Sequence, residues 1–392
     1  MVGLIQEQHP DRCRLFMQWK QMDWPVMVDA LNRLEVKAVP ITVFVDEHGI
    51  VRNIPGRRGD RAEMAAQFAA ASFEAPARGE PSIEKPDVAG MNLDELKRAK
   101  AEALIIKGDL ALLAALNAPD GAALDIAIES FRDALEHHPN PGLTHFQLGV
   151  AYRTRFDSAY RHADDFNKAI AHWQKALDLD PNQYIWRRRI EQYGPRLMKP
   201  YSFYDWVHEA RSDIEVRGET PVQLAVEPSG AEFANPERTF TLDDEPRENP
   251  DPEGRIDRDK EGLIRAQVIV VPSAVKAGRA VRVHVLMTPD QSPRVKGHWN
   301  NEVDDTVVWV DVPVESGWSV DKPYLTVPRP ANTKSAVSME TRQVEFELMV
   351  PEGLAPGTHS IPAFALYYVC EDVDGKCLYR RQDLAIHVNV VE

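Results

Sequence analysis

The chain of 392 residues is expected to form two or three domains, at about 150 residues per domain. Its 46 lysines and arginines and 61 aspartates and glutamates give a formal net charge of −15, which would repel nucleic acid phosphates and anionic lipid. We therefore expect no nucleic acid partner. No uninterrupted apolar stretch approaches the ~18 residues needed to cross a bilayer, so we also expect no transmembrane segment.

The first segment, residues 1–75, has the alternation of strand and helix patterns that is typical of α/β structure. Strands are expected at 2–5, 26–29, 41–46 and 50–53, and helices at 11–22 and 60–73. Residues 76–91 contain several prolines and few large apolar side chains, which indicates a linker.

Residues 24–29 and 36–51 resemble the second half of a thioredoxin-like redoxin. The resemblance implies that Pro40 is the proline that this family holds in the cis form, facing the active-site disulfide. The family's first strand, its Cys-x-x-Cys motif and the following helix should come before this segment, and the sequence does not contain them. We therefore expect a partial thioredoxin-like segment. Truncation is the interpretation we favour, and a structural remnant without chemistry is the alternative.

The segment 92–214 has helical periodicity and an internal repeat. Ala127-Ile128-x-x-Phe131-x-x-Ala134-Leu135-x-x-x-Pro139 recurs as Ala169-Ile170-x-x-Trp173-x-x-Ala176-Leu177-x-x-x-Pro181. Both copies resemble the second helix of tetratricopeptide repeats. This resemblance implies an all-α tetratricopeptide repeat domain, on which a peptide or protein partner would dock.

The two remaining segments differ sharply in composition. Residues 215–262 are acidic and proline-rich, which predicts a linker. Residues 263–392 contain several short stretches in which apolar and polar side chains alternate, and they predict an all-β sandwich of immunoglobulin-like type. The predicted fold class is thus multidomain, with an α/β, an all-α and an all-β part in chain order.

Two of the three cysteines lie close together near the end of the chain. Cys370 and Cys377 are separated by an Asp-Gly turn signal between two apolar stretches, so a hairpin would bring their sulfurs to bonding distance. Closing so short a ring contributes only about 2.5 kcal/mol, which is a weak reason for the pair in a domain of this size. Cys13 has no second cysteine nearby and is expected to be a packed or half-exposed thiol rather than a nucleophile.

The segment 266–392 resembles the N-terminal domain of the DsbD family of thiol:disulfide interchange proteins, although six residues separate the cysteines here where five are expected. The resemblance implies that Cys370 and Cys377 are catalytic cysteines exchanging electrons with a protein thiol or disulfide partner. It also implies that tyrosines surround them and that a loop covers them. The tyrosines are Tyr367, Tyr368 and Tyr379, and the candidate covering loop is 298–302.

The charges around the cysteine pair give no clear sign of activation. Lys376 and Arg380 would lower the pKa of a thiol, and Glu371, Asp372 and Asp374 would oppose that. The twelve histidines show no metal-ligand spacing, so we expect no metal, and no motif predicts a cofactor.

Two functions remain open from the sequence. The first is thiol–disulfide exchange in the periplasm or cell envelope, which the resemblance and the preference of disulfides for oxidising compartments both favour. The alternative is a non-catalytic scaffold that binds a peptide and carries a structural disulfide, in which case a cytoplasmic location is also compatible.

Overall fold

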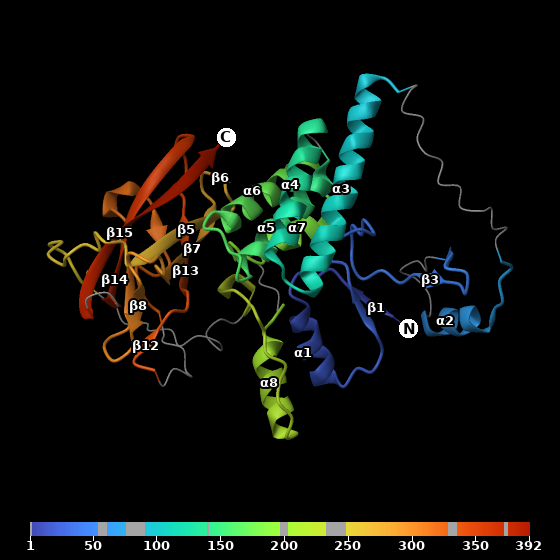
Figure 1. Cartoon of the computed structure of the whole chain (residues 1–392), viewed down its shortest axis with the longest axis horizontal. Coiled ribbons are helices and arrows are strands. Elements are labelled where there is room, and N and C mark those ends of the chain that lie inside the picture. The colour runs from blue at the N-terminus through green and yellow to red at the C-terminus, as the bar shows by residue number, and fades with distance from the viewer. Residues whose placement is uncertain are drawn as a thin grey trace.

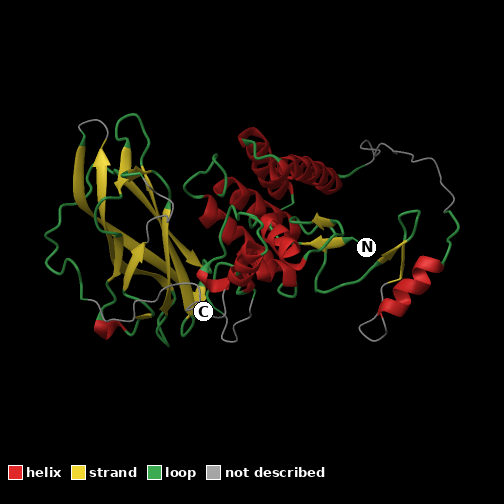
Figure 2. Ribbon diagram, turned by 90° about the horizontal axis from the view of Figure 1, so that it is seen from below, coloured by secondary structure: helices red, strands yellow, loops and turns green. Residues whose placement is uncertain are grey.

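The computed structural model of the protein describes residues 2–53, 61–75, 91–138, 141–196, 203–232, 248–327, 335–371 and 375–392. Apart from residue 91, the predicted linker 76–91 lies outside the described residues. Helices occupy the middle of the molecule, and two sheets lie on one side of them. A small unit of β3 (Phe44–Val45), β4 (Val51–Asn53) and α2 (Arg61–Ala70) lies on the other side (Figures 1 and 2).

The central helices pack as successive antiparallel pairs, α3 with α4 and α5 with α6. A capping box formed by Asn92 and Glu95 starts α3, and the side chain of Asp120 caps α4. The helices are α3 (Leu93–Asn117), α4 (Gly121–His137), α5 (Gly142–Phe156), α6 (Asp165–Leu179) and α7 (Tyr184–Glu191).

The repeated sequence pattern marks two close helix contacts. Phe131 and Trp173 occupy equivalent places in the pattern, and both side chains are fully buried. Phe131 lies against Gly108 of the preceding helix, and Trp173 lies against Gly149. In each case the aromatic ring occupies the space that a Cβ atom on the glycine would need, so the helices approach closely.

Replacing Gly149 by alanine is therefore expected to destabilise the protein. The added Cβ would lie 2.4 Å from the indole ring of the fully buried Trp173, which has no room to move. Overpacking of this kind costs about 1–3 kcal/mol, which outweighs the gain of about 1 kcal/mol in helix propensity. Chemical denaturation measures the difference. A variant as stable as the wild type, or more stable, would contradict the close packing.

Two sheets form the other half of the molecule, and the side chains between them make one core. The four-stranded sheet has the order β10-β13-β7-β5, and the larger sheet has the order β11-β9-β14-β15-β6, with β8 pairing with both β14 and β12. The strands of the first sheet are β5 (Ile264–Val271), β7 (Ala280–Pro289), β10 (Ser319–Val320) and β13 (Arg342–Met349). Those of the second are β6 (Val275–Lys276), β8 (Gly297–Asn300), β9 (Thr306–Val310), β11 (Tyr324–Val327), β12 (Val337–Ser338), β14 (Gly357–Glu371) and β15 (Lys376–Val391).

The four-stranded sheet is covered on both faces. Its strands β5 and β7 place Ile269, Val271 and Leu286 in the same hydrophobic cluster as the helices, while other side chains of these strands face the second sheet. On the helix-facing side, Arg282 bonds to Glu345 and Glu347 of β13. The layers in order are therefore helices, four-stranded sheet and larger sheet.

His284 also lies on this buried face and is fully covered. Its Nε2 lies 2.8 Å from the carbonyl oxygen of Tyr193, which follows α7, and its Nδ1 lies 3.5 Å from Glu345. Burial alone would raise the pKa of Glu345, but the charges of His284 and Arg282 hold it well below its usual range. Polar side chains thus connect the sheet to the helices.

The N-terminal segment is divided between two places. Strand β1 (Gly3–Ile5) pairs in parallel with β2 (Val26–Val28), and helix α1 (Pro10–Lys20) packs through Leu15 on α8 (Trp206–Val216). Strands β3 (Phe44–Val45) and β4 (Val51–Asn53) form a separate pair beside α2 (Arg61–Ala70). This second unit stands apart from the rest (Figure 1).

The predicted fold class is wrong. The described helices do not make a separate all-α domain, because their core continues into β5 and β7. The N-terminal strands do not form one thioredoxin-like sheet, because β1–β2 and β3–β4 are independent pairs. The C-terminal strands do not form a clear immunoglobulin-like sandwich, since one of the two sheets is itself covered by helices. The chain is a mixed α/β structure.

A buried ion pair further joins segments that are distant in the sequence. Arg12 of α1 bonds through Nη1 to Glu232 at 2.9 Å, and both side chains are almost completely buried. The Arg12 guanidinium also lies over the ring of Tyr204, whose hydroxyl donates a hydrogen bond to Glu7. Burial raises the pKa of Glu232 to about 7, although the charge of Arg12 opposes this.

Candidate functional site

The cysteine pair lies at the end of the longest hairpin in the described structure, formed by β14 and β15. Cys370 and Cys377 are directly opposite each other in the ladder, are joined by a disulfide, and have Cα atoms 4.0 Å apart. Gly375 in the turn has a φ of 64°, a conformation that glycine adopts without strain. The hairpin predicted from the Asp-Gly turn signal is therefore present, with the two sulfurs bonded.

The two cysteine residues differ in their exposure. Cys370 is only 4% exposed, whereas Cys377 is exposed to solvent. A thiolate from another molecule would thus reach the sulfur of Cys377 first, and the sulfur of Cys370 would be the leaving group.

Two of the predicted tyrosines share the face of the sheet that carries the disulfide. Tyr368 and Tyr379 are opposite each other one step along the same face, and their ring centroids are 4.4 Å apart. Burial raises the pKa of the Tyr379 hydroxyl to about 12, with a further contribution from Tyr368. Tyr379 therefore stays neutral, and the two rings form an aromatic surface next to the disulfide.

The third predicted tyrosine, Tyr367, points the other way. It is fully buried in the core between the two sheets, because its position differs by an odd number from that of Cys370. Its hydroxyl donates a hydrogen bond of 2.8 Å to Asp259, and its ring meets Trp299 edge to face. Burial and the Asp259 charge raise its pKa. Tyr367 thus lies on the inner face of the hairpin, where a partner protein could not reach it.

Asp259 was not predicted as part of the site, since it lies in the segment predicted as an acidic linker. Its carboxylate accepts hydrogen bonds from Tyr367 and from the backbone amides of Leu263 and Ile264. Nearby, Arg381 of β15 bonds to Asp251 at 2.7 Å. The described part of this segment is therefore packed along β15, and nothing in its composition indicates these contacts.

The predicted covering loop 298–302 begins as a strand. Residues Gly297–Asn300 form β8, which pairs with β14 on the side away from β15, and His298 is directly opposite Cys370. Trp299 is fully buried, and its ring lies under the guanidinium of Arg342. The segment is next to the disulfide as predicted, but it extends the sheet there rather than covering the sulfurs as a loop.

The charged side chains that could change the pKa of the cysteine thiols lie in different places. Lys376 is directly opposite Glu371 in the hairpin, so the two charges next to the cysteines have opposite sign. Arg380 is on the face of the sheet opposite to the disulfide and has its Nη1 3.8 Å from Asp257. Asp372 and Asp374 lie outside the described residues. Neither Lys376 nor Arg380 therefore gives the sulfurs a clear excess of positive charge.

Pro40 is not brought to the cysteine pair. The Val39–Pro40 peptide bond is cis, and Pro40 lies exposed in the segment between β2 and β3. Strand β3 is at the opposite end of the molecule from β14 (Figure 1). The predicted site residues therefore divide into a cluster on the hairpin and a distant proline.

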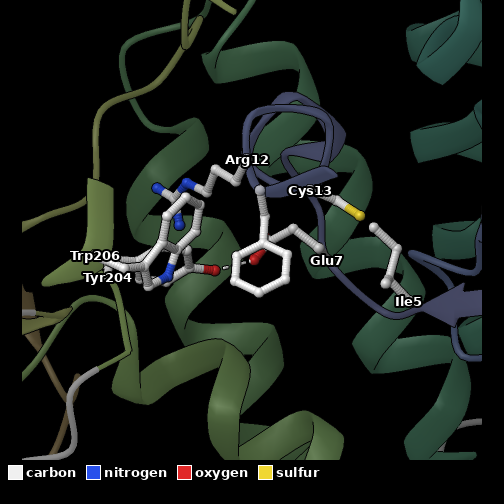
Figure 3. Close-up of a pocket in the computed structure, with 7 residues that line it drawn as sticks. Ile5, Glu7, Arg12, Cys13, Tyr204 and Trp206 are labelled. Carbon is white, nitrogen blue, oxygen red and sulfur yellow. Dashed lines mark hydrogen bonds between the residues drawn. The ribbon is translucent and has the colours of Figure 1, made fainter. Parts of the chain in front are cut away.

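A pocket of about 230 Å³ lies beside the third cysteine (Figure 3). Its walls include Glu7, Arg12, Cys13 and Tyr204, and burial raises the pKa of the Cys13 thiol. Of these walls, Arg12 bonds to Glu232, and Glu7 accepts a hydrogen bond from Tyr204. Cys13 is half-exposed, and burial keeps its thiol protonated, as expected for a packed thiol.

Within the described residues, no group of three or more histidine, cysteine, aspartate or glutamate side chains is arranged to hold a metal ion. None of the described helices combines the length and the apolar composition needed for crossing a bilayer.

No protein-family model matches the chain, and neither does any curated protein sequence. Among solved structures, AvmM, described as catalysing macrocyclization in alchivemycin A biosynthesis, is 15% identical with a TM-score of 0.18, covering 35% of this chain and 96% of that chain. The sporulation control protein Spo0M from Bacillus subtilis is 15% identical with a TM-score of 0.15, covering 33% and 51%. A putative membrane anchored protein from Corynebacterium diphtheriae is 9% identical with a TM-score of 0.21, covering 35% and 38%. Similarities this weak carry no functional argument.

Proposed function

We propose that the protein exchanges thiols and disulfides with a protein partner through Cys370 and Cys377. The observation that carries the proposal is the arrangement of the pair: an exposed cysteine is bonded to a buried one at the turn end of the β14–β15 hairpin. Exchange requires one reachable sulfur and a leaving sulfur that stays in place, and this pair has both.

The exchange would proceed in two steps. In the first, a partner thiolate attacks the sulfur of Cys377, a new disulfide forms between the partner and Cys377, and the electron pair of the broken bond goes to the sulfur of Cys370. In the second, another thiolate of the partner attacks the partner's own sulfur in this mixed disulfide and releases Cys377 as a thiolate. The partner is then oxidised by two electrons, and the cysteine pair is reduced. The reverse sequence reduces a partner disulfide.

The partner would dock on the aromatic surface of Tyr368 and Tyr379, because this surface lies beside the sulfur that must be reached. Tyrosines are well suited to interfaces, since they provide a large apolar area and a polar end. A protein thiol or disulfide partner and an oxidising compartment such as the periplasm or cell envelope are part of this proposal.

The competing function is a structural disulfide that only fastens the hairpin, and the burial of Cys370 favours it. The reduction potential separates the two. We expect equilibration of the pair with a dithiothreitol or glutathione redox buffer to give a value above about −300 mV, as for exchangeable pairs. The alkylated fraction, measured by mass spectrometry of the native full chain, gives this potential. A value below about −300 mV would mark a structural disulfide and refute the exchange function.

A further inference from the structure

The buried sulfur of the pair has a second neighbour in the sheet. Strand β14 lies between β15 and β8, so Cys370 has Cys377 directly opposite on one side and His298 directly opposite on the other. Figure 1 shows β8 running beside β14. Directly opposite residues in an antiparallel pair have Cβ atoms about 4.5–5.5 Å apart, which places an imidazole within reach of the Cys370 sulfur.

The face of the sheet agrees with this placement. Val369 and Trp299 are opposite each other one step further along, and both are fully buried in the core between the sheets. Because successive side chains of a strand alternate between faces, Cys370 and His298 both lie on the outer face. His298 is half-buried there, so it is open to solvent while directly opposite Cys370 in the ladder.

We propose that His298 is the acid that stabilises the Cys370 thiolate when the disulfide opens. This inference rests on the proposed exchange function. As the partner thiolate bonds to Cys377, the electron pair of the broken bond goes to the Cys370 sulfur, and the imidazolium of His298 stabilises this charge or transfers its proton to it. In the reverse direction, neutral His298 takes the proton from the Cys370 thiol before its sulfur attacks the mixed disulfide.

Among the residues that the structure describes, the other groups near the pair do not supply a comparable cation. The closest charged neighbours along the ladder are Glu371 of β14 and Lys376 of β15, which are opposite each other and of opposite sign. On the far side of β8, strand β12 contributes Val337 and Ser338, which carry no charge. His298 is therefore the titratable group directly opposite the leaving sulfur.

Further titratable groups lie on or near the same face of the sheet, at a greater distance from Cys370. Tyr368 and Tyr379 lie one step from the cysteines, and the pKa of Tyr379 is raised by its burial and by its neighbours. Those neighbours include Asp251 and Asp304, which have negative charge. None of these groups is a cation that would replace His298.

The test is the rate at which dithiothreitol reduces the native full chain between about pH 5 and 9. This range covers the usual titration of an imidazole. Aliquots are quenched with an alkylating agent and analysed by mass spectrometry, and each rate constant is divided by the thiolate fraction of dithiothreitol at that pH. The matched control is His387→Gln, because His387 is exposed on the same face of β15 at the other end of the hairpin.

For the wild type and for His387→Gln, we expect the corrected rate constant to rise about threefold as the pH falls, since one unit of thiol pKa changes exchange rates by about that factor. For His298→Gln we expect a constant that does not change with pH. In His298→Lys, the lysine side chain stays positively charged over the whole pH range of the test. We therefore expect this variant to keep, at every pH, the high rate constant that the wild type shows at low pH. This second variant tests the proposal if His298→Gln fails to fold.

Three results would overturn the proposal. The first is a His298→Gln variant that keeps the wild-type pH profile, and the second is a wild type without any pH dependence after correction. In both cases exchange itself would be intact, so only the role of His298 would be refuted. The third is a native disulfide that dithiothreitol does not reduce at any pH, in which case the exchange function and the role of His298 would both be refuted.

Discussion

Replacing Arg12 by methionine should lower the free energy of unfolding by about 3–5 kcal/mol, the usual cost of removing one partner from a buried ion pair. Arg12 and Glu232 are both almost completely buried, and the variant leaves the Glu232 carboxylate without its cation. The loss should be larger at pH 8 than at pH 5. Burial raises the pKa of Glu232 to about 7, so at the lower pH a proton neutralises the unpaired carboxyl in the folded state.

Chemical denaturation of the full chain at the two pH values measures this effect. The double variant Arg12→Met with Glu232→Gln removes both charges and should recover at least half of the lost stability, because the cost arises mainly from the unpaired charge. A single variant within about 1 kcal/mol of the wild type at pH 8 would show that the pair contributes little to stability.

The two single-cysteine variants should differ strongly in reactivity. Cys370→Ser leaves the exposed Cys377 as a free thiol, and Cys377→Ser leaves Cys370, which is only 4% exposed. We expect the first variant to react with an aromatic disulfide reagent roughly tenfold faster or more than the second, because access limits the attack. Release of the coloured thiol follows the reaction in the native protein.

Denaturant provides the control for this comparison, since both thiols should react at similar rates once the chain is unfolded. Equal rates in the native state would show that the hairpin opens faster than it reacts. The proposed order of attack at Cys377 before release of Cys370 would then be wrong.

Local patterns predicted local structure well. The repeated Ala-Ile-x-x-aromatic pattern places Phe131 and Trp173 in fully buried helix contacts, and the Asp-Gly turn signal places Cys370 opposite Cys377. These features depend on neighbours within one or two elements, and the sequence specifies such neighbours through side-chain periodicity and turn chemistry. The hairpin and the pairing of its cysteines are therefore accessible from the sequence.

The arrangement of the layers was not accessible in the same way. In β7, Arg282 and His284 alternate with valines, which is typical of a strand with one face in water, yet both are buried against the helices. Alternation shows that a strand has two kinds of face, but it does not show what covers the polar one. The partners that make burial possible are Glu345 for Arg282 and the Tyr193 carbonyl for His284, and they lie 63 and 91 positions away in the sequence.

For a related reason, the linker predicted for residues 215–262 does not describe all of this acidic segment. Its composition indicates a solvated linker, but Glu232 and Asp259 each meet one specific partner, Arg12 and Tyr367. Composition averages over a segment, whereas burial of a carboxylate depends on a single cation or hydroxyl brought to it by the fold. His298 was likewise connected with the disulfide from the sequence, but its position opposite Cys370 depends on strand register, which no local pattern specifies.

The long ladder of β14 and β15 has a consequence for the lifetime of any exchange intermediate. The two strands pair continuously from Gly357 and Val390 to Glu371 and Lys376, so backbone hydrogen bonds keep the Cα atoms of the cysteines close whether or not the sulfurs are bonded. Cys370 then has a very high effective concentration toward a mixed disulfide on Cys377. Reclosure of the ring is fast, and a partner completes the transfer only if its own second thiol is already positioned to compete.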